Sequence, residues 1–329
     1  MHGSERARDL HREHPPIDLH VDSLMWARSL GYDFTRRHEP PLPFAAAGGH
    51  VDLPRLREGG LGAVFLGLVS VFALVNEYAD AVDEQLDIAH ALVASTPELA
   101  LARSCADIEA CSAMGQIALL LGLEGAHALH GSLARLAHFA ARGVRYLGLV
   151  HFSANDAACP SWGAGRDDSV GLSSFGRDLV RACEDLDVLI DLAHVNRPGF
   201  MDACAIARRP VIVSHTGVSG AFPHWRNIDD LQLRAVADTG GVVGTIFVPM
   251  FLGGRKLEHV VRHVRHVIDV AGEDAAALGS DWDGWIIPTP DLRDASHLPL
   301  LTDALLDSGL SPRQVAKVLR GNALRVLRP

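Results

Sequence analysis

Short apolar runs recur along this chain and alternate with segments of helical periodicity. The helical segments carry apolar residues three and four positions apart, and they cover residues 78–94, 133–142, 175–186, 199–208, 230–238 and 259–271. The apolar runs occupy residues 17–21, 63–69, 117–123, 144–150, 188–193, 211–214, 242–248 and 276–280. Such alternation predicts parallel strands that are joined by crossover helices.

The apolar runs are hydrophobic at nearly every position, as in residues 117–123, rather than alternately apolar and polar. This pattern is typical of strands that are covered on both faces, as in a parallel sheet inside helical layers. Eight such units predict an α/β fold of the (β/α)8 TIM-like barrel type, formed by a single domain over residues 1–329. Residues 1–16 are expected to form a loose N-terminal arm.

The tail beyond Leu298 is predicted to add helices that pack outside the barrel. Ser311 and Pro312 are a suitable N-cap and first helical residue for a helix that continues over residues 313–319. Asn322 is expected to cap a last turn.

Composition narrows the function classes. The chain has 40 acidic and 30 basic residues, which give a formal net charge of −10. Because phosphate binding needs a basic face and no basic run exceeds two residues, we expect no nucleic-acid partner. The weakly polar stretch 61–75 is shorter than the roughly 20 residues of a membrane-spanning helix, so we expect no membrane partner. The first residues lack the apolar segment of a signal peptide, which predicts a cytoplasmic protein with a small-molecule partner.

The chain is unusually rich in histidine, a common metal ligand, with 18 residues. Its five cysteines are scattered and never spaced as C-x-x-C, so they indicate no metal site. Several histidines and carboxylates directly follow apolar runs, where reactive groups lie in a barrel of this type. Unpaired charges in such places are costly, and a bound metal would offset that cost. The side chains that follow the runs are His20, Asp22, Glu124, His151, His194, His215 and Asp281.

The spacing of these groups predicts two metal ions. His20 and Asp22 lie two apart on a strand, so both project to one face and can share an ion. Alone, this pair is equally typical of a strand end with a capping Asp, but His194 and His215 add a second pair of ligands. Glu124 ends an apolar run and, with two oxygens, can bridge both ions of a two-metal hydrolase around a shared hydroxide. Mixed nitrogen and oxygen ligands favour Zn²⁺, with Mn²⁺, Co²⁺ and Fe²⁺ as alternatives.

At these residues the chain resembles the membrane (renal) dipeptidases, zinc enzymes among the metal-dependent amidohydrolase barrels. The resemblance runs almost end to end. Its most specific segments are IDLHVDSLMW (17–26), GGHVDLPRLREGGLGAVF (48–65), LLGLEGAHAL (120–129), GVRYLGLVH (143–151), GLSSFGRDLVRACEDLDVLIDLAHV (171–195), PVIVSHT (210–216), RNIDDLQL (226–233), LGSDWDG (278–284) and GNALRVL (321–327).

The resemblance implies a role for each site residue. His20, Asp22 and Glu124 would hold one zinc ion, and Glu124, His194 and His215 the other. It further implies that His151 polarises the scissile carbonyl group and that Asp281 exchanges protons with the nucleophile and the leaving amine. Arg226 would bind the terminal carboxylate of a dipeptide, and a homodimer is expected at the level of the family.

The substrate remains open at this stage. The loop over residues 152–162 departs from that of better-known family members, and Trp282 and Trp285 flank Asp281, which favours a bulky or hydrophobic side chain. Family members often accept a D-residue at the C-terminal position, so L-D as well as L-L dipeptides are expected. The alternative is an amidohydrolase that acts on a lactam, an N-acyl amino acid or another small amide, because the metal site serves all of these.

His259, His263 and His266 share one face of a predicted helix. We interpret them as an exposed His/Arg face and not as a metal site.

Overall fold

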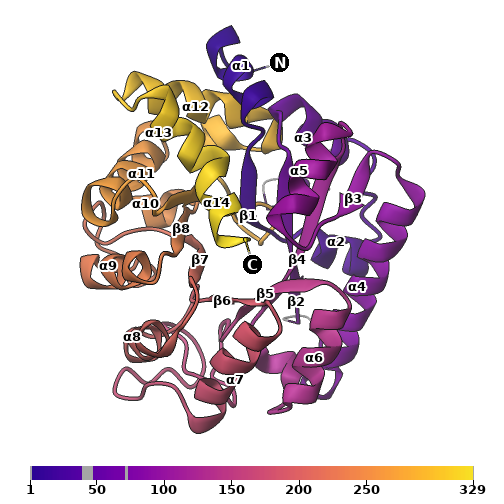
Figure 1. Cartoon of the computed structure of the whole chain (residues 1–329), viewed down its shortest axis with the longest axis vertical. Helices are drawn as coiled ribbons and strands as arrows, with labels where there is room; N and C mark the ends of the chain where they lie inside the picture. Colours follow the sequence, from indigo (N-terminus) through magenta and orange to yellow (C-terminus); the bar gives the residue numbers. More distant parts are fainter. Residues whose placement is uncertain (1, 39–46, 71–72, 329) are drawn as a thin grey trace.

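Eight parallel strands close into a barrel in the computed structural model, which describes residues 2–38, 47–70 and 73–328. Neighbouring strands pair in the order β2-β1-β9-β8-β7-β6-β5-β4, and β4 also pairs with β2, which closes the ring. The predicted (β/α)8 barrel is therefore confirmed, with helices arranged around the strands (Figure 1). The strands are β1 (Ile17–Val21), β2 (Ala63–Val69), β4 (Ile117–Glu124), β5 (Val144–Gly148), β6 (Leu189–Asp191), β7 (Ile212–Thr216), β8 (Val242–Thr245) and β9 (Ala276–Leu278).

The helices that surround the barrel include every helix predicted from the apolar spacing. The surrounding helices are α2 (Ser23–Leu30), α3 (Leu53–Gly59), α4 (Tyr78–Ser95), α5 (Cys105–Ala113), α6 (Leu133–Ala141), α7 (Ser174–Asp185), α8 (Arg197–Ile206), α9 (Asp230–Asp238), α10 (Pro249–Leu252) and α11 (Leu257–Ala271). A short strand that the pattern does not predict, β3 (Leu99–Leu101), pairs with β4 outside the ring. None of the helices in the described ranges is both long and apolar enough to cross a membrane.

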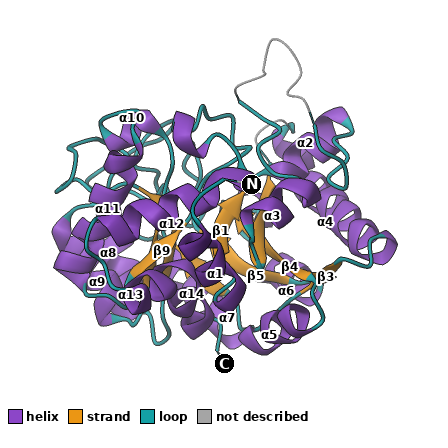
Figure 2. Cartoon of the chain, turned by 90° about the horizontal axis from the view of Figure 1, so that it is seen from above, coloured by secondary structure: helices purple, strands orange, loops and turns teal. Residues whose placement is uncertain are grey.

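The chain beyond β9 forms α12 (Leu298–Asp307), α13 (Pro312–Ala316) and α14 (Asn322–Val326). Ser311 is the N-cap of α13 in a capping box, as predicted. Asn322 does not cap a turn: its amide group donates to the carbonyl oxygens of Glu273 and Ala276 and so ties α14 to the segment that enters β9. Side chains of α14 pack in one cluster with the first residues of several strands, so this helix covers the amino-terminal end of the barrel. Figure 2 shows α2 and α10 at the opposite end from the C-terminus.

The N-terminal residues are not a loose arm, because α1 (Glu5–Glu13) packs against α12. Ser4 caps this helix, and its one long apolar residue, Leu10, is buried. His11 is buried as well, with Nδ1 2.7 Å from Gly59 O and Nε2 2.6 Å from Thr302 Oγ1. The neutral imidazole satisfies both contacts if Nδ1–H donates to Gly59 and Nε2 accepts from Thr302.

We expect His11 to make the stability of the fold depend on pH. Burial lowers the pKa of His11 from its ordinary 6.5 to about 4. Between these values the unfolded chain binds a proton that the folded chain does not, so stability falls as the pH falls from about 6.5 to about 4. When the pH falls from 7 to 5, the free energy of unfolding of the parent protein should decrease by about 2 kcal/mol more than that of His11→Gln. Urea unfolding of both proteins at the two pH values measures this, and equal losses would contradict it.

Candidate active site

The residues that the sequence singles out lie together at the carboxyl-terminal end of the barrel. His20 and His215 belong to β1 and β7, Asp22 follows β1 directly, and Glu124 is the last residue of β4. Three more lie three residues past the ends of β5, β6 and β9, namely His151, His194 and Asp281. His194 and Asp281 have positive φ angles of 68° and 64°, so the chain turns sharply where these side chains enter the site.

One carboxylate oxygen of Glu124 is the centre of the group. It lies 3.1 Å from Nε2 of His194, and 3.6 Å from Nε2 of each of three other imidazoles, those of His20, His151 and His215. His194 and His215 bring their Nε2 atoms within 2.9 Å of each other. Four imidazoles therefore face one buried carboxylate, although they come from four different strands or strand ends.

Buried polar atoms without partners mark this place as a cation site. Among the described residues, Glu124 Oε2 is buried without a hydrogen-bond partner, and the buried His20 Nε2 and Asp22 Oδ1 make no hydrogen bond although they lie 3.3 Å apart as an ion pair. Such atoms cost free energy unless a ligand satisfies them, and imidazole nitrogens with carboxylate oxygens are the donors that zinc and similar ions prefer. The side chains present therefore fit a bound metal.

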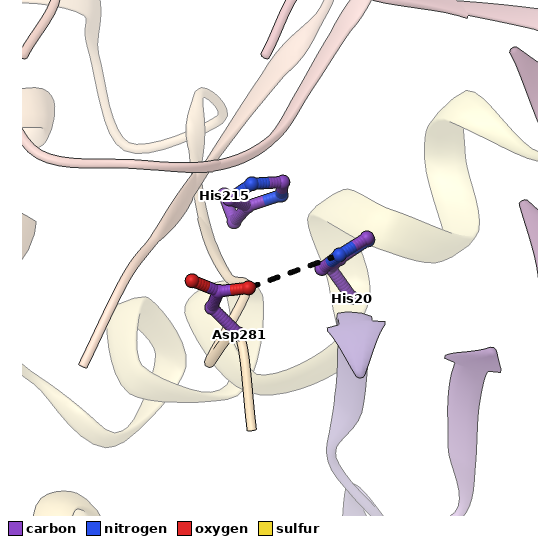
Figure 3. Close-up of side chains that lie close together, drawn as sticks. All are labelled: His20, His215 and Asp281. Carbon is purple, nitrogen blue, oxygen red and sulfur yellow. Dashed lines mark ion pairs between the residues drawn. The ribbon is translucent and has the colours of Figure 1, made fainter. Parts of the chain in front are cut away.

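The donor atoms fall into three sets, each within 4.8 Å. Two sets share Glu124: one adds His20 and Asp22, and the other adds His194 and His215. The third set joins His20, His215 and Asp281 (Figure 3), with Asp281 Oδ1 3.9 Å from His20 Nε2. The first two sets have the same members as the two ligand groups proposed from the sequence.

Residues that sequence reasoning missed hold the imidazoles in place. Ser214 Oγ donates to Asp191 Oδ2 at 2.6 Å, so it accepts from Nδ1–H of His215 at 2.9 Å and leaves Nε2 free to face the site. The hydroxyl group of Tyr146 lies 2.6 Å from Nδ1 of His20. Tyr146 resembles an ordinary core residue in the sequence, whereas Ser214 stands directly before His215 and could have been found there.

Burial and charge set the protonation of the site. Burial lowers the pKa values of His194 and His215 well below the ordinary range, so both imidazoles are neutral, the form in which they can bind a cation. Burial also lowers the pKa of His20, but Asp22 and Glu124 raise it more, and the net shift is upward. Burial raises the pKa of Glu124, as does the nearby charge of Asp22, and burial raises the pKa of Asp281 to about 7. A cation would relieve this crowding of carboxylates.

Arg226 brings a buried positive charge to the edge of the site. It lies in the loop between β7 and α9, donates to His215 O at 2.8 Å and to Thr216 Oγ1 at 3.3 Å, and is only 4% exposed. No carboxylate of the described residues lies within ion-pair distance of its guanidinium group. A buried guanidinium without a carboxylate partner favours an anionic ligand.

A cavity of about 750 Å³ opens above these residues. Its floor includes Glu124, His151, His194, Arg226 and Asp281, and its walls are mainly apolar. His151 is buried with its Nδ1 atom unpaired, and its ring lies 4.0 Å from that of Phe152. The arrangement can therefore hold a small molecule between a cation site and an arginine.

The helix face with three histidines lies apart from this site. The prediction that the face is exposed is wrong for His263, which is buried and accepts a hydrogen bond from Val218 N–H at 2.9 Å. His266 pairs with Asp230 at 2.7 Å. The face therefore connects α11 to α9 and to the segment after β7, and these contacts explain it without a ligand.

Known proteins match nearly the whole chain. The model of the membrane dipeptidase family (peptidase family M19) matches residues 4–329. Dipeptidase tcpJ of Claviceps purpurea is 33% identical in an alignment of 327 positions that covers 94% of this chain and 76% of that protein. A metallopeptidase from Rhodobacter sphaeroides, liganded with a phosphinate mimic of the dipeptide L-Ala-D-Ala, is 26% identical with a TM-score of 0.83, over 95% of this chain and 98% of that one. The probable dipeptidase PvdM from Pseudomonas aeruginosa has a TM-score of 0.90 at 20% identity, covers 98% of this chain and 97% of its own, and shows the fold alone.

Proposed function

This chain belongs to the membrane dipeptidase family (peptidase family M19) and is a metal-dependent dipeptidase, and we propose that it works as a dinuclear zinc hydrolase. The observation that carries the proposal is Glu124, whose carboxylate belongs to both ligand sets. His20 and Asp22 would complete one zinc site, and His194 and His215 the other. Mn²⁺, Co²⁺ or Fe²⁺ would also suit these ligands.

The chain's own residues would divide the work on a dipeptide. Metal ions held by these ligands would lower the pKa of water, so that it can serve as the nucleophile, and would polarise the scissile carbonyl group. His151 would donate a hydrogen bond to the carbonyl oxygen as negative charge develops there. Asp281 would take the proton from the nucleophile and give one to the leaving amine. Arg226 would bind the terminal carboxylate with two parallel hydrogen bonds.

We propose both L-L and L-D dipeptides as substrates. The relative from Rhodobacter sphaeroides, which holds a mimic of L-Ala-D-Ala, supports the second class. An amidohydrolase that acts on a lactam, an N-acyl amino acid or another small amide is the alternative. A single domain, a cytoplasmic location and a homodimer stay predictions.

Recognition of the substrate's terminal carboxylate distinguishes a dipeptidase from an amidohydrolase that acts on neutral amides. Arg226→Met removes the charge but keeps the length of the side chain, and hydrogen bonds to charged groups contribute about 1.5–3 kcal/mol. We therefore expect KM for dipeptides to rise about 10- to 150-fold, with little change for dipeptide amides that lack the carboxylate. Steady-state kinetics of the zinc-loaded proteins on Ala-Ala and Ala-Ala amide measure this. Equal effects on both substrates would remove Arg226 from carboxylate recognition, and hydrolysis of neutral lactams alone would favour the alternative.

A substitution at Gly67, which lies beside Asp22 and His20, tests the assignment of Asp22 as a metal ligand. A Cβ atom at this position would overlap Asp22 Oδ1 and lie 3.1 Å from His20 Cε1. Gly67→Ala should therefore displace Asp22 and weaken zinc binding about 10- to 100-fold, as loss of supporting residues does elsewhere. Gly321→Ala, whose Cβ atom would meet nothing nearer than 3.8 Å, is the matched control. Competition with a chelator measures the affinities, and equal values for both variants would contradict the assignment of Asp22.

A further inference from the structure

The cavity above the candidate site is larger than a dipeptide of two small residues needs. Its volume of about 750 Å³ lies in the upper part of the range of pockets that hold drug-sized ligands, roughly 300–1,000 Å³. Apart from Arg255, the charged and imidazole side chains that line the cavity belong to the site described above. The room that remains is bordered mainly by apolar side chains.

Five large apolar side chains at this cavity are strongly exposed, and we call them the apolar rim. Single apolar side chains on a surface are ordinary, but several at the mouth of one cavity mark a binding site. They come from four separate segments of the chain, so no single amphipathic helix explains them. The apolar rim consists of Phe152 (43% exposed), Trp225 (42%), Met250 (61%), Trp285 (43%) and Ile287 (57%).

Ring contacts hold the two tryptophans of the rim in place. Trp285 packs on the buried Trp26 at 4.7 Å between ring centroids, and Trp26 Nε1 donates to Asp283 O at 2.6 Å. Trp225 stacks on Trp162 at 5.2 Å. Since these rings are already ordered by their neighbours, a ligand that covers them loses little free energy to side-chain ordering.

Charge gives the substrate one direction in the cavity. The carboxylate of a dipeptide is attracted to Arg226, and its ammonium group is attracted to Asp281, a carboxylate that belongs to neither of the sets sharing Glu124. Met25 and Trp285 border the cavity on that side: Met25 follows Asp22 on α2, and Trp285 follows Asp281 in the same loop. The side chain of the amino-terminal residue would therefore face Trp285.

We propose that Trp285, Ile287 and Met250, the part of the apolar rim that follows the neighbouring strands β9 and β8, form a subsite for the side chain of the amino-terminal residue of the substrate. Preferred substrates are then dipeptides in which a large aromatic or aliphatic residue precedes the scissile bond. This inference rests on the proposed function and adds the class of substrate. A substrate whose amino-terminal residue carries a benzyl group instead of a methyl group should therefore have a kcat/KM about 10- to 100-fold higher, the usual range for apolar groups of this size.

The test compares Phe-Ala with Ala-Ala on the zinc-loaded enzyme. We expect Trp285→Ala to lower the ratio of the two kcat/KM values about tenfold, and Met250→Ala, on α10, to lower it in the same direction. Met114→Ala is the matched control, because Met114 is 74% exposed on the segment between α5 and β4, at the other end of the barrel. Met250 keeps the test valid if loss of Trp285 disturbs the loop that carries Asp281.

A binding measurement separates this inference from the proposed function. Calorimetry with two phosphinate pseudodipeptides, which carry a benzyl or a methyl group at the amino-terminal position, should give a Kd about tenfold or more lower for the benzyl compound. Hydrolysis of both dipeptides with equal kcat/KM would overturn the subsite and leave the proposed function intact. Tighter binding of the benzyl compound without hydrolysis of any dipeptide would overturn the proposed function and retain the subsite. An equal effect of Met114→Ala would also overturn the subsite.

Discussion

Replacing Asp281 by Asn is expected to lower kcat about 10²- to 10⁴-fold while the fold and the zinc content stay unchanged. Asn keeps the shape of Asp and tolerates the positive φ angle of 64° at this position, so the loop should persist. The amide group cannot take up and release the proton that passes from the nucleophile to the leaving amine. Asp281 belongs to neither of the two sets that share Glu124, so its loss should spare the ions that these sets would hold.

The measurement combines elemental analysis with steady-state kinetics on one dipeptide. Asp269→Asn, an exposed position on α11, makes the same chemical change away from the cavity and should leave kcat unaltered. Undiminished kcat in Asp281→Asn would remove Asp281 from proton transfer. Loss of zinc from that variant would instead make Asp281 a ligand and contradict the division of the ligand sets.

The strands were predictable from the sequence because burial on both faces leaves a nearly unbroken apolar run. The bounds of β1, β2 and α9 agree with the predicted ranges. Runs that were predicted too long, such as 188–193 and 242–248, end early because their last residues leave the barrel and enter loops over the site. The three residues of β3 are too few to show a periodicity.

That these polar residues lie together was predictable for a related reason. A histidine or carboxylate directly after an apolar run is unusual, and the barrel geometry brings all such positions to one end. The supporting contact of Tyr146 could not be read from the sequence, because a buried Tyr in a strand also fits an ordinary core. Gly122 is the one local sign of it, since a side chain at that position would overlap the ring of Tyr146.

The wrong predictions concern contacts between distant parts of the chain. Residues 5–13 are polar and show no long apolar stripe, yet α1 is held by the contact of His11 with Thr302, which lies 291 residues away. His263 has basic neighbours on its helix and was expected to be exposed, but Val218 N–H needs an acceptor and His263 provides it. Neither partner is visible from local periodicity.

Glu124 is expected to destabilise the fold when metal is absent and to stabilise it when metal is bound. In the metal-free protein its carboxylate is buried, its Oε2 atom has no partner among the described residues, and burial raises its pKa because the charged form is disfavoured. Oε1 has the imidazoles as neighbours but Oε2 has none, so an amide, which carries no charge, should remove a cost of roughly 1–3 kcal/mol. With metal present, the same carboxylate would be the one ligand shared by both ions.

Glu124→Gln should therefore be more stable than the parent protein without metal, yet bind fewer than two zinc ions and lose the stabilisation that zinc gives. A ligand at 100 times its Kd stabilises the folded state by about 2.7 kcal/mol, so the order of the two melting temperatures should reverse when zinc is added. Calorimetric melting with a chelator and with excess zinc, together with elemental analysis, measures this. Glu13→Gln, at the end of α1, is the surface control and should change neither value. Two zinc ions per chain in Glu124→Gln would contradict a bridging role, because an amide oxygen is a poor substitute for a carboxylate between two cations.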